Sequence, residues 1–341
     1  MTYQLMYKDV VVAEFEPQTV NDYTVFNAQF LPVGLRNGMS LERWLHQRRA
    51  DKSRVSVRKL FATLKLNFGD DDYISGFRKP TDFWWLRKKG SDELFAMEVE
   101  DLHLIALGIE AVVPKSPRNF EVANIGSYEK GWKNDNLLKS GNLNEIFSEM
   151  LYARISEKYM PTATYASERI GERVFVSTPN FINQQAGEYL VLADEWTGTG
   201  AEEEFSDWLA KYANTLADHE MTGMKIMYFL DVVMNNFDRH CQNFGFVYHE
   251  KGDRNLAPNF DFNLSIIGYN GLANLGANEM TARHYFDLFN EVPESLKTPP
   301  MLSMVKSEIK DICTDLGLDC EAYMVIADWL VTRWEQILNE Q

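Results

Sequence analysis

A polar loop held between an apolar helical run and an alternating strand constrains this chain more than any other feature. The run before the loop is rich in large apolar side chains: Met224, Met227, Tyr228, Val232 and Met234. After the loop, Phe244, Phe246 and Tyr248 alternate along the chain as in a half-buried strand. A helix and a strand therefore fix both ends of the loop, which is a common setting for functional side chains.

The loop contains Asp238 and, five positions later, Asn243; a second aspartate follows at Asp261. Phosphoryl transfer needs a carboxylate that orients or deprotonates the attacking hydroxyl, and hard oxygen ligands for Mg²⁺. The D-x-x-x-x-N spacing is that of a protein-kinase catalytic loop, and Asp261 with Phe262 and Asn263 is a variant of the kinase Asp-Phe-Gly turn. A polar turn without function is the alternative. Three groups in this order favour Asp238 as base, and Asn243 with Asp261 as metal ligands.

The loop and the segment after it resemble the signature of HipA-like serine/threonine kinases, the toxin-kinase relatives found in bacteria. The resemblance is carried by Asp238-Arg-His-Cys-Gln-Asn-Phe-Gly, by the preceding Asn236, and by Ala257-Pro-Asn-Phe-Asp-Phe-Asn-Leu-Ser265. It implies an α+β, two-lobed protein-kinase-like fold with a mixed, β-rich N-lobe and a mainly helical C-lobe. It also implies ATP- and Mg²⁺-dependent transfer of the γ-phosphate to a protein Ser or Thr.

Upstream, the resemblance extends to a sparse phosphate-binding loop. The family pattern Gly-x-x-x-Lys, followed by a lysine on a strand, fits Gly126, Ser127 and Lys130, and then Lys139. These residues would hold the ATP phosphates. Taken alone, the loop lacks a full Gly-x-Gly-x-x-Gly, and a hairpin glycine with a solvated lysine is the alternative.

A glutamate on the helix after this strand is expected to hold Lys139. Glu149 matches the helix glutamate of the family better than Glu145. Glu145 lies nearer the helix start, where a carboxylate offsets the helix dipole.

Three residues of the catalytic stretch have expected supporting roles. Arg239 pairs with a phosphorylated residue or with Asp238, and His240 braces the loop through hydrogen bonds. Asn236 caps the preceding helix. The family's glycine is replaced by Asn263, and asparagine is among the few residues other than glycine that adopt left-handed backbone.

The predicted organisation has three parts. Residues 1–120 form an N-terminal region of short strands and a basic helical segment that includes a helix from Val55 to Leu66. Residues 121–197 form the kinase N-lobe with the phosphate loop, and residues 198–341 form the helical C-lobe with the catalytic and metal-binding loops. Gly198 and Gly200 predict a linker between the lobes.

A formal net charge of −16 argues against direct nucleic-acid binding. Residues 36–65 are an exception to this acidic composition, because they contain nine basic residues and only two acidic ones, Glu42 and Asp51. A solvated helical face or a docking site for an acidic partner explains such a run. No apolar run approaches the ~20 residues of a membrane span, no signal peptide is recognisable, and three cysteines form no disulfide framework. These features predict a cytoplasmic protein.

Several functions remain open at this point. A small-molecule or lipid kinase would use the same residues, and a non-catalytic regulatory protein would bind nucleotide without transfer. A protein that binds partners through segment 36–65 is a third alternative. The family resemblance also implies a small antitoxin or regulatory protein as a partner.

Overall fold

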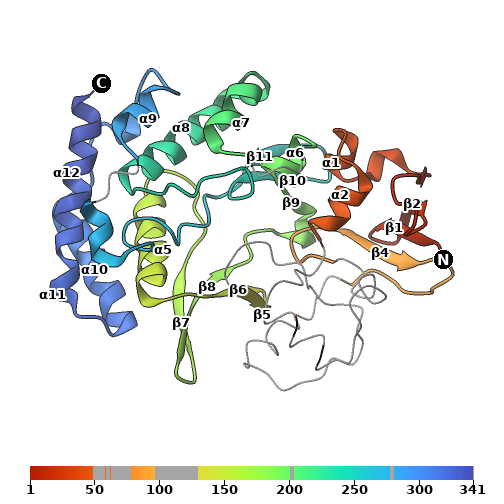
Figure 1. Cartoon of the computed structure of the whole chain (residues 1–341), viewed down its shortest axis with the longest axis horizontal. Coiled ribbons are helices and arrows are strands. Elements are labelled where there is room, and N and C mark those ends of the chain that lie inside the picture. Colours follow the sequence, from red (N-terminus) through yellow and green to blue (C-terminus); the bar gives the residue numbers. More distant parts are fainter. Residues whose placement is uncertain are drawn as a thin grey trace. The chain divides into compact units, whose positions relative to one another are not determined.

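The computed structural model describes residues 1–48, 58, 62, 78–96, 130–199, 203–276 and 280–340. The chain divides into two compact units that interleave along the sequence. The first comprises Met1–Lys139, Ile182–Ala201 and Gly245–Arg254, and the second comprises Ser140–Phe181, Glu202–Phe244 and Asn255–Gln341. Figure 1 labels their helices and strands. The predicted helix from Val55 to Leu66 lies almost entirely outside the described residues, and the lobe boundaries predicted from the sequence stay predictions.

An antiparallel sheet in the order β3-β2-β1-β4 begins the first unit. Its strands are β1 (Tyr3–Tyr7), β2 (Val10–Phe15), β3 (Thr24–Val25) and β4 (Trp84–Lys88). Phe83, Trp84 and Trp85 are buried, as the sequence predicts for core aromatic residues. Both indole N–H groups have acceptors, because Trp84 donates to the carbonyl oxygen of Phe30 (2.8 Å) and Trp85 to that of Lys8 (2.7 Å).

The short helices η1 (Ala28–Phe30), α1 (Val33–Arg36) and α2 (Leu41–His46) follow β3. Ser40 caps α2, since its Oγ accepts a hydrogen bond from the Arg43 N–H (3.2 Å). Arg48, just after α2, departs from the expected solvated basic face. It is only 2% exposed and forms an ion pair with the buried Asp82. Most of segment 36–65 beyond Arg48 lies outside the described residues.

The first unit also contains the antiparallel hairpin of β5 (Lys130–Lys133) and β6 (Asn136–Ser140), and the antiparallel pair of β9 (Glu188–Leu192) and β10 (Gly245–His249). Position 245 requires glycine, because a Cβ there would lie 2.4 Å from the carbonyl oxygen of Val191. The helix η2 (Gln184–Ala186) precedes β9, and α6 (Ala193–Trp196) follows it where the sequence predicts a linker. The strand β11 (Arg254–Leu256) lies where the chain passes into the second unit.

The second unit is mainly helical, with one antiparallel hairpin of β7 (Ala166–Ile170) and β8 (Arg173–Pro179). Its longer helices are α5 (Leu143–Ser156), α7 (Phe205–Tyr212), α8 (Asp218–Val233), α10 (Leu302–Leu316) and α12 (Val325–Asn339). Its shorter ones are η3 (Ala213–Thr215), η4 (Gly271–Gly276), α9 (Ala282–Phe286), η5 (Glu294–Leu296) and α11 (Cys320–Tyr323). The α-helices α7 and α8 precede the polar loop, and α10, α11 and α12 lie near the C-terminus. No helix within the described ranges has both the length and the apolar character needed to cross a membrane.

Helix α8 carries the polar loop at its C-terminal end, and that end is fixed by packing. The helix is buried along most of its length and packs against α9 and α12 (Figure 1). The Arg333 guanidinium of α12 donates to the carbonyl oxygens of Val232 (2.6 Å) and Val233 (2.9 Å). These carbonyls are among those that a helix end leaves without partners, so the start of the loop is held in place.

Helix α5 begins with a capping box, which makes its stability testable. Asn142 Oδ1 accepts from the N–H groups of Asn144 (2.9 Å) and Glu145 (3.1 Å), and the Glu145 carboxylate accepts from the Asn142 N–H (2.7 Å). Asn142→Ala removes one acceptor and should lower the free energy of unfolding by about 1 kcal/mol, measured by urea unfolding with circular dichroism. Asn142→Asp keeps an acceptor and should stay near wild type. Equal losses in both variants would contradict the role of the cap.

Candidate functional site

The polar loop starts with a left-handed turn at the end of α8. Asn235 has φ 54°, a conformation that asparagine tolerates better than most residues and that commonly ends helices. The N–H of Asn236 then donates to the Asp231 carbonyl oxygen (2.8 Å) inside the helix. The cap residue of α8 is Met234, so Asn236 lies two residues beyond the cap and closes the helix end through this backbone bond.

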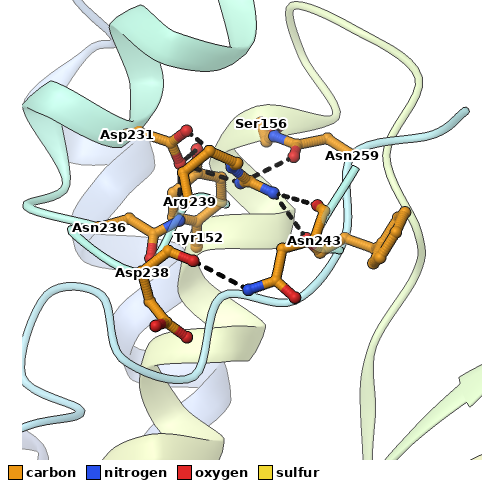
Figure 2. Close-up of polar contacts among 9 residues, drawn as sticks. Tyr152, Ser156, Asp231, Asn236, Asp238, Arg239, Asn243 and Asn259 are labelled. Atoms are coloured by element: carbon orange, nitrogen blue, oxygen red, sulfur yellow. Dashed lines mark hydrogen bonds and ion pairs between the residues drawn. The ribbon is translucent and has the colours of Figure 1, made fainter. Parts of the chain in front are cut away.

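The Asp231 side chain is the centre of a buried polar network (Figure 2). Its carboxylate is 0% exposed and accepts hydrogen bonds from Tyr152 Oη (2.8 Å) and Asn236 Nδ2 (2.7 Å). It also accepts from Arg239 Nε (2.8 Å) and Nη2 (2.9 Å) in a bidentate pair. Sequence reasoning did not single out this residue. Its signal is a carboxylate within an otherwise apolar helical run, which is unusual unless the charge is paired.

Arg239 uses all of its N–H donors inside the protein. Besides the two bonds to Asp231, Nη2 donates to Asn259 Oδ1 (3.0 Å), and Nη1 donates to the carbonyl oxygens of Asn243 (2.5 Å) and Phe260 (3.0 Å). Five donors thus meet five acceptor contacts. Burial alone would lower the pKa of Arg239, but the Asp231 carboxylate more than offsets this and the pKa is raised. The expected pairing of Arg239 with Asp238 or with a phosphorylated residue is therefore corrected: Arg239 is 2% exposed and its partner is Asp231.

Through Arg239 the two predicted metal ligands are tied to one group. The Asn243 carbonyl oxygen and that of Phe260, the residue before Asp261, both bind Nη1. Asn259, two residues before Asp261, is held further by its own Nδ2, which donates to Ser156 Oγ (3.3 Å). The loop of residues 238–243 and the turn at Asp261 are separate in sequence and meet at this guanidinium.

The side chains of Asn243 and Asp238 have defined directions. Asn243 is 6% exposed, and its Nδ2 donates to the Asp238 carbonyl oxygen (2.9 Å). Because the amide nitrogen is used in this bond, the amide oxygen points away from the Asp238 carbonyl. A metal ligand would need its oxygen to be available in this way. Figure 2 shows the Asp238 side chain pointing away from the Asp231–Arg239 pair.

The turn at Asp261 has the backbone strain that often accompanies functional sites. Asp261 has φ 65°, and its N–H donates to Tyr165 Oη (3.1 Å). The next residue, Phe262, is buried and stacks on Tyr152 with a centroid distance of 4.0 Å. The left-handed residue of the turn is therefore Asp261. Asn263, the position expected to need this freedom, is not among the described residues with positive φ.

The loop has further supports of the kind that the sequence predicts. Gln242 donates its N–H to His240 Nδ1 (3.3 Å), and Asn243 donates its N–H to the His240 carbonyl oxygen (2.8 Å). The bracing role of His240 agrees with these bonds. Cys241 is buried and accepts from the Glu203 N–H (3.0 Å), which ties the loop to the segment before α7.

The described residues predicted to bind phosphates, Lys130 and Lys139, belong to the first unit, and Glu149 belongs to the second. Lys139 lies on β6, 7% exposed, directly opposite Lys130 on β5, so both side chains leave the hairpin on one face. Glu149 is buried on α5. Glu145 serves the capping box of that helix, at the position where the sequence expects a dipole-compensating carboxylate. Gly126 and Ser127 lie outside the described residues, and the pairing of Lys139 with Glu149 stays a prediction.

The donor set of the loop suits Mg²⁺ bound together with phosphates. Among the described residues, no group of three or more His, Cys, Asp and Glu side chains is arranged to hold a metal ion. Mg²⁺ commonly takes one or two protein oxygens and completes its octahedral shell with water and substrate phosphates. Asn243 and Asp261 fit such a partial shell.

The structure resembles HipA in the Shewanella oneidensis MR-1 toxin–antitoxin complex of HipA, HipB and operator DNA. The match covers 99% of this chain and 96% of that chain, with 11% sequence identity and a TM-score of 0.52. The Helicobacter pylori proinflammatory kinase CtkA also matches, over 64% of this chain and 92% of that chain, with 16% identity and a TM-score of 0.44. No family model matches the sequence, and neither does any curated protein.

The HipA match carries the fold assignment, because it spans nearly the whole chain. The chain has a HipA-like kinase fold. The fold class predicted from the sequence is thus confirmed.

The buried Asp231–Arg239 pair gives a stability test. Asp231→Leu or Arg239→Met leaves one buried charge without its partner and should cost about 3–5 kcal/mol of unfolding free energy. The double variant should lose clearly less than the sum of the two, measured as a double-mutant cycle by urea unfolding. Arg283→Met, which removes a surface pair with Asp287, should have no measurable effect. Additive losses would contradict direct coupling of the two side chains.

Proposed function

We propose that this protein is an ATP- and Mg²⁺-dependent kinase that transfers the γ-phosphate to a Ser or Thr of a protein. One observation carries the proposal. The guanidinium of Arg239 binds the backbone of Asn243 and the backbone just before Asp261, which ties the segments of the two predicted metal ligands to one buried point. Kinase chemistry depends mainly on positioning and charge, and this arrangement supplies the positioning.

In this mechanism each residue has a distinct task. Asp238 orients the acceptor hydroxyl and takes its proton, while Asn243 and Asp261 hold Mg²⁺ through side-chain oxygens. Bound Mg²⁺ would neutralise charge that develops on the phosphate oxygens. Lys139, braced by Glu149, pairs with the α- and β-phosphates, and Lys130 lies beside it on the same face of the hairpin.

The proposal also covers the molecule that accepts the phosphate and the protein partner of this chain. A small-molecule or lipid kinase would use identical residues, so the acceptor that takes up phosphate separates these functions. The HipA structure to which this chain is similar contains HipB. We therefore propose a small antitoxin-like or regulatory protein as the partner of this chain. We also propose that the chain acts in the cytoplasm.

The catalytic assignment is tested with isosteric variants. Asp238→Asn removes the base and Asp261→Asn removes a charged metal ligand. Each should reduce transfer of label from γ-labelled ATP to protein Ser or Thr by at least about 100-fold. Asp261→Asn should also raise the Mg²⁺ concentration needed for half-maximal activity. Reactions contain the purified protein alone or with a cytoplasmic lysate.

Asp328→Asn is the matched control, because Asp328 is a surface carboxylate with 60% side-chain exposure. It should transfer phosphate at the wild-type rate. Wild-type transfer by Asp238→Asn would exclude the proposed mechanism. Label in a lipid or small-molecule fraction in place of protein would select the alternative kinase.

The role of Lys139 is tested separately. Lys139→Met keeps an aliphatic stem of similar length but removes a charged contact to phosphate, which should raise the KM for ATP by about 10- to 100-fold. Lys133→Met, on β5 of the same hairpin, is the control and should leave the KM for ATP unchanged. Equal effects of both substitutions would indicate a general charge effect and contradict a specific contact.

A further inference from the structure

Two exposed aromatic side chains contact each other beside the proposed base. Phe237 is 36% exposed and Tyr269 is 60% exposed, and their ring centroids lie 5.6 Å apart at an interplanar angle of 87°. Single exposed apolar residues are common on proteins. A pair of exposed rings that adjoins a catalytic loop is more informative, because aromatic residues are typical anchors of binding surfaces.

The catalytic loop places Phe237 at the surface. Its neighbour Asn236 is buried and bonded to Asp231 through its side chain, and the carbonyl of its other neighbour, Asp238, accepts from Asn243 Nδ2. With both neighbours held by these bonds, the backbone at Phe237 is fixed next to the proposed base. Consecutive Cα atoms are about 3.8 Å apart, so Phe237 and the proposed base leave the backbone at adjacent positions.

A strained segment places Tyr269. Ile266 has φ 51°, which is an outlier for a β-branched residue. The strain is held by hydrogen bonds from the N–H of Ile266 to the Met234 carbonyl oxygen (2.7 Å) and from Asn274 Nδ2 to the Ile266 carbonyl oxygen (2.6 Å). Strained backbone persists where surrounding contacts over-determine it, and it is concentrated at functional sites.

The residues between Ile266 and Tyr269 add two more constraints. The N–H of Ile267 donates to Ser148 Oγ of α5 (3.2 Å). At Gly268 an added Cβ would lie 1.8 Å from the Asn263 carbonyl oxygen, so only glycine fits. The backbone before Tyr269 is thus fixed tightly, and the tyrosine ring that follows it is left exposed beside Phe237.

We propose that Phe237 and Tyr269, the aromatic pair, bind a large apolar side chain adjacent to the acceptor Ser or Thr of a polypeptide substrate. The inference rests on the proposed function and names a specificity determinant for it. The perpendicular rings form a corner that surrounds an aliphatic or aromatic side chain on two sides. A nucleic-acid base would stack on a single flat face, and the net charge of −16 disfavours a phosphate backbone.

The test uses a positional-scanning library of short peptides, each with one central serine and one flanking position fixed in turn. Transfer from γ-labelled ATP and formation of ADP are measured in the same reactions with the full chain. Wild type should prefer Phe, Leu or Met over Ala by about tenfold at a position next to the serine. Tyr269→Ala should lose this preference, and Tyr269→Phe should keep it.

Phe26→Ala is the matched control, since Phe26 is an exposed aromatic residue (54%) in the other unit. It should keep the wild-type preference. A preference that survives Tyr269→Ala, or a wild type without apolar preference, would overturn the aromatic pair while leaving the kinase intact. Failure to label any peptide would also overturn it. In that case labelling of lysate protein that is lost in Asp238→Asn would show that the proposed kinase still stands, and its absence would remove both.

Discussion

The buried ion pair of Asp231 and Arg239 is the interaction on which the site depends. A guanidinium that is 2% exposed is tolerable only if its charge and its donors are satisfied, and Asp231 supplies the charge. The remaining donors bind oxygens of Asn243, Asn259 and Phe260. The need to satisfy one buried cation therefore determines where the polar loop and the turn at Asp261 meet. Such a pair contributes little net stability, and its value lies in specifying one arrangement.

Around this pair, buried and exposed groups have separate tasks. Tyr152, Asn236 and Phe262 are covered by the protein and hold the backbone, whereas Phe237 and Tyr269 are exposed on the same two segments. A rigid interior allows the side chains that meet substrate to be few and well placed. The left-handed residues Asn235, Asp261 and Ile266 mark the places where the chain departs from regular structure to achieve this.

The first unit uses a similar device for a different purpose. Arg48 and Asp82 form a buried pair, and the Arg48 guanidinium also lies 4.1 Å from the centroid of the Trp44 ring. The Arg48–Asp82 ion pair joins the end of α2 to the residues just before β4, and both elements contribute to one hydrophobic core. A basic run in the sequence indicates a solvated surface, and here one member of that run is a core residue. A solvated arginine and a buried one differ here only in having a partner far along the chain, Asp82.

Local pattern in the sequence was sufficient to predict the apolar helix α8, the alternating strand β10, and the spacing of Asp238, Asn243 and Asp261. Periodicity, capping chemistry and motif spacing are properties of neighbouring residues, so they can be predicted without a fold. The tertiary structure decided which partner each polar group takes. Asp231 had no visible role until folding brought Tyr152 and Arg239 to it, and the same is true of Tyr269 beside Phe237. These pairings join residues that are separate in sequence, and only packing of the whole unit selects them.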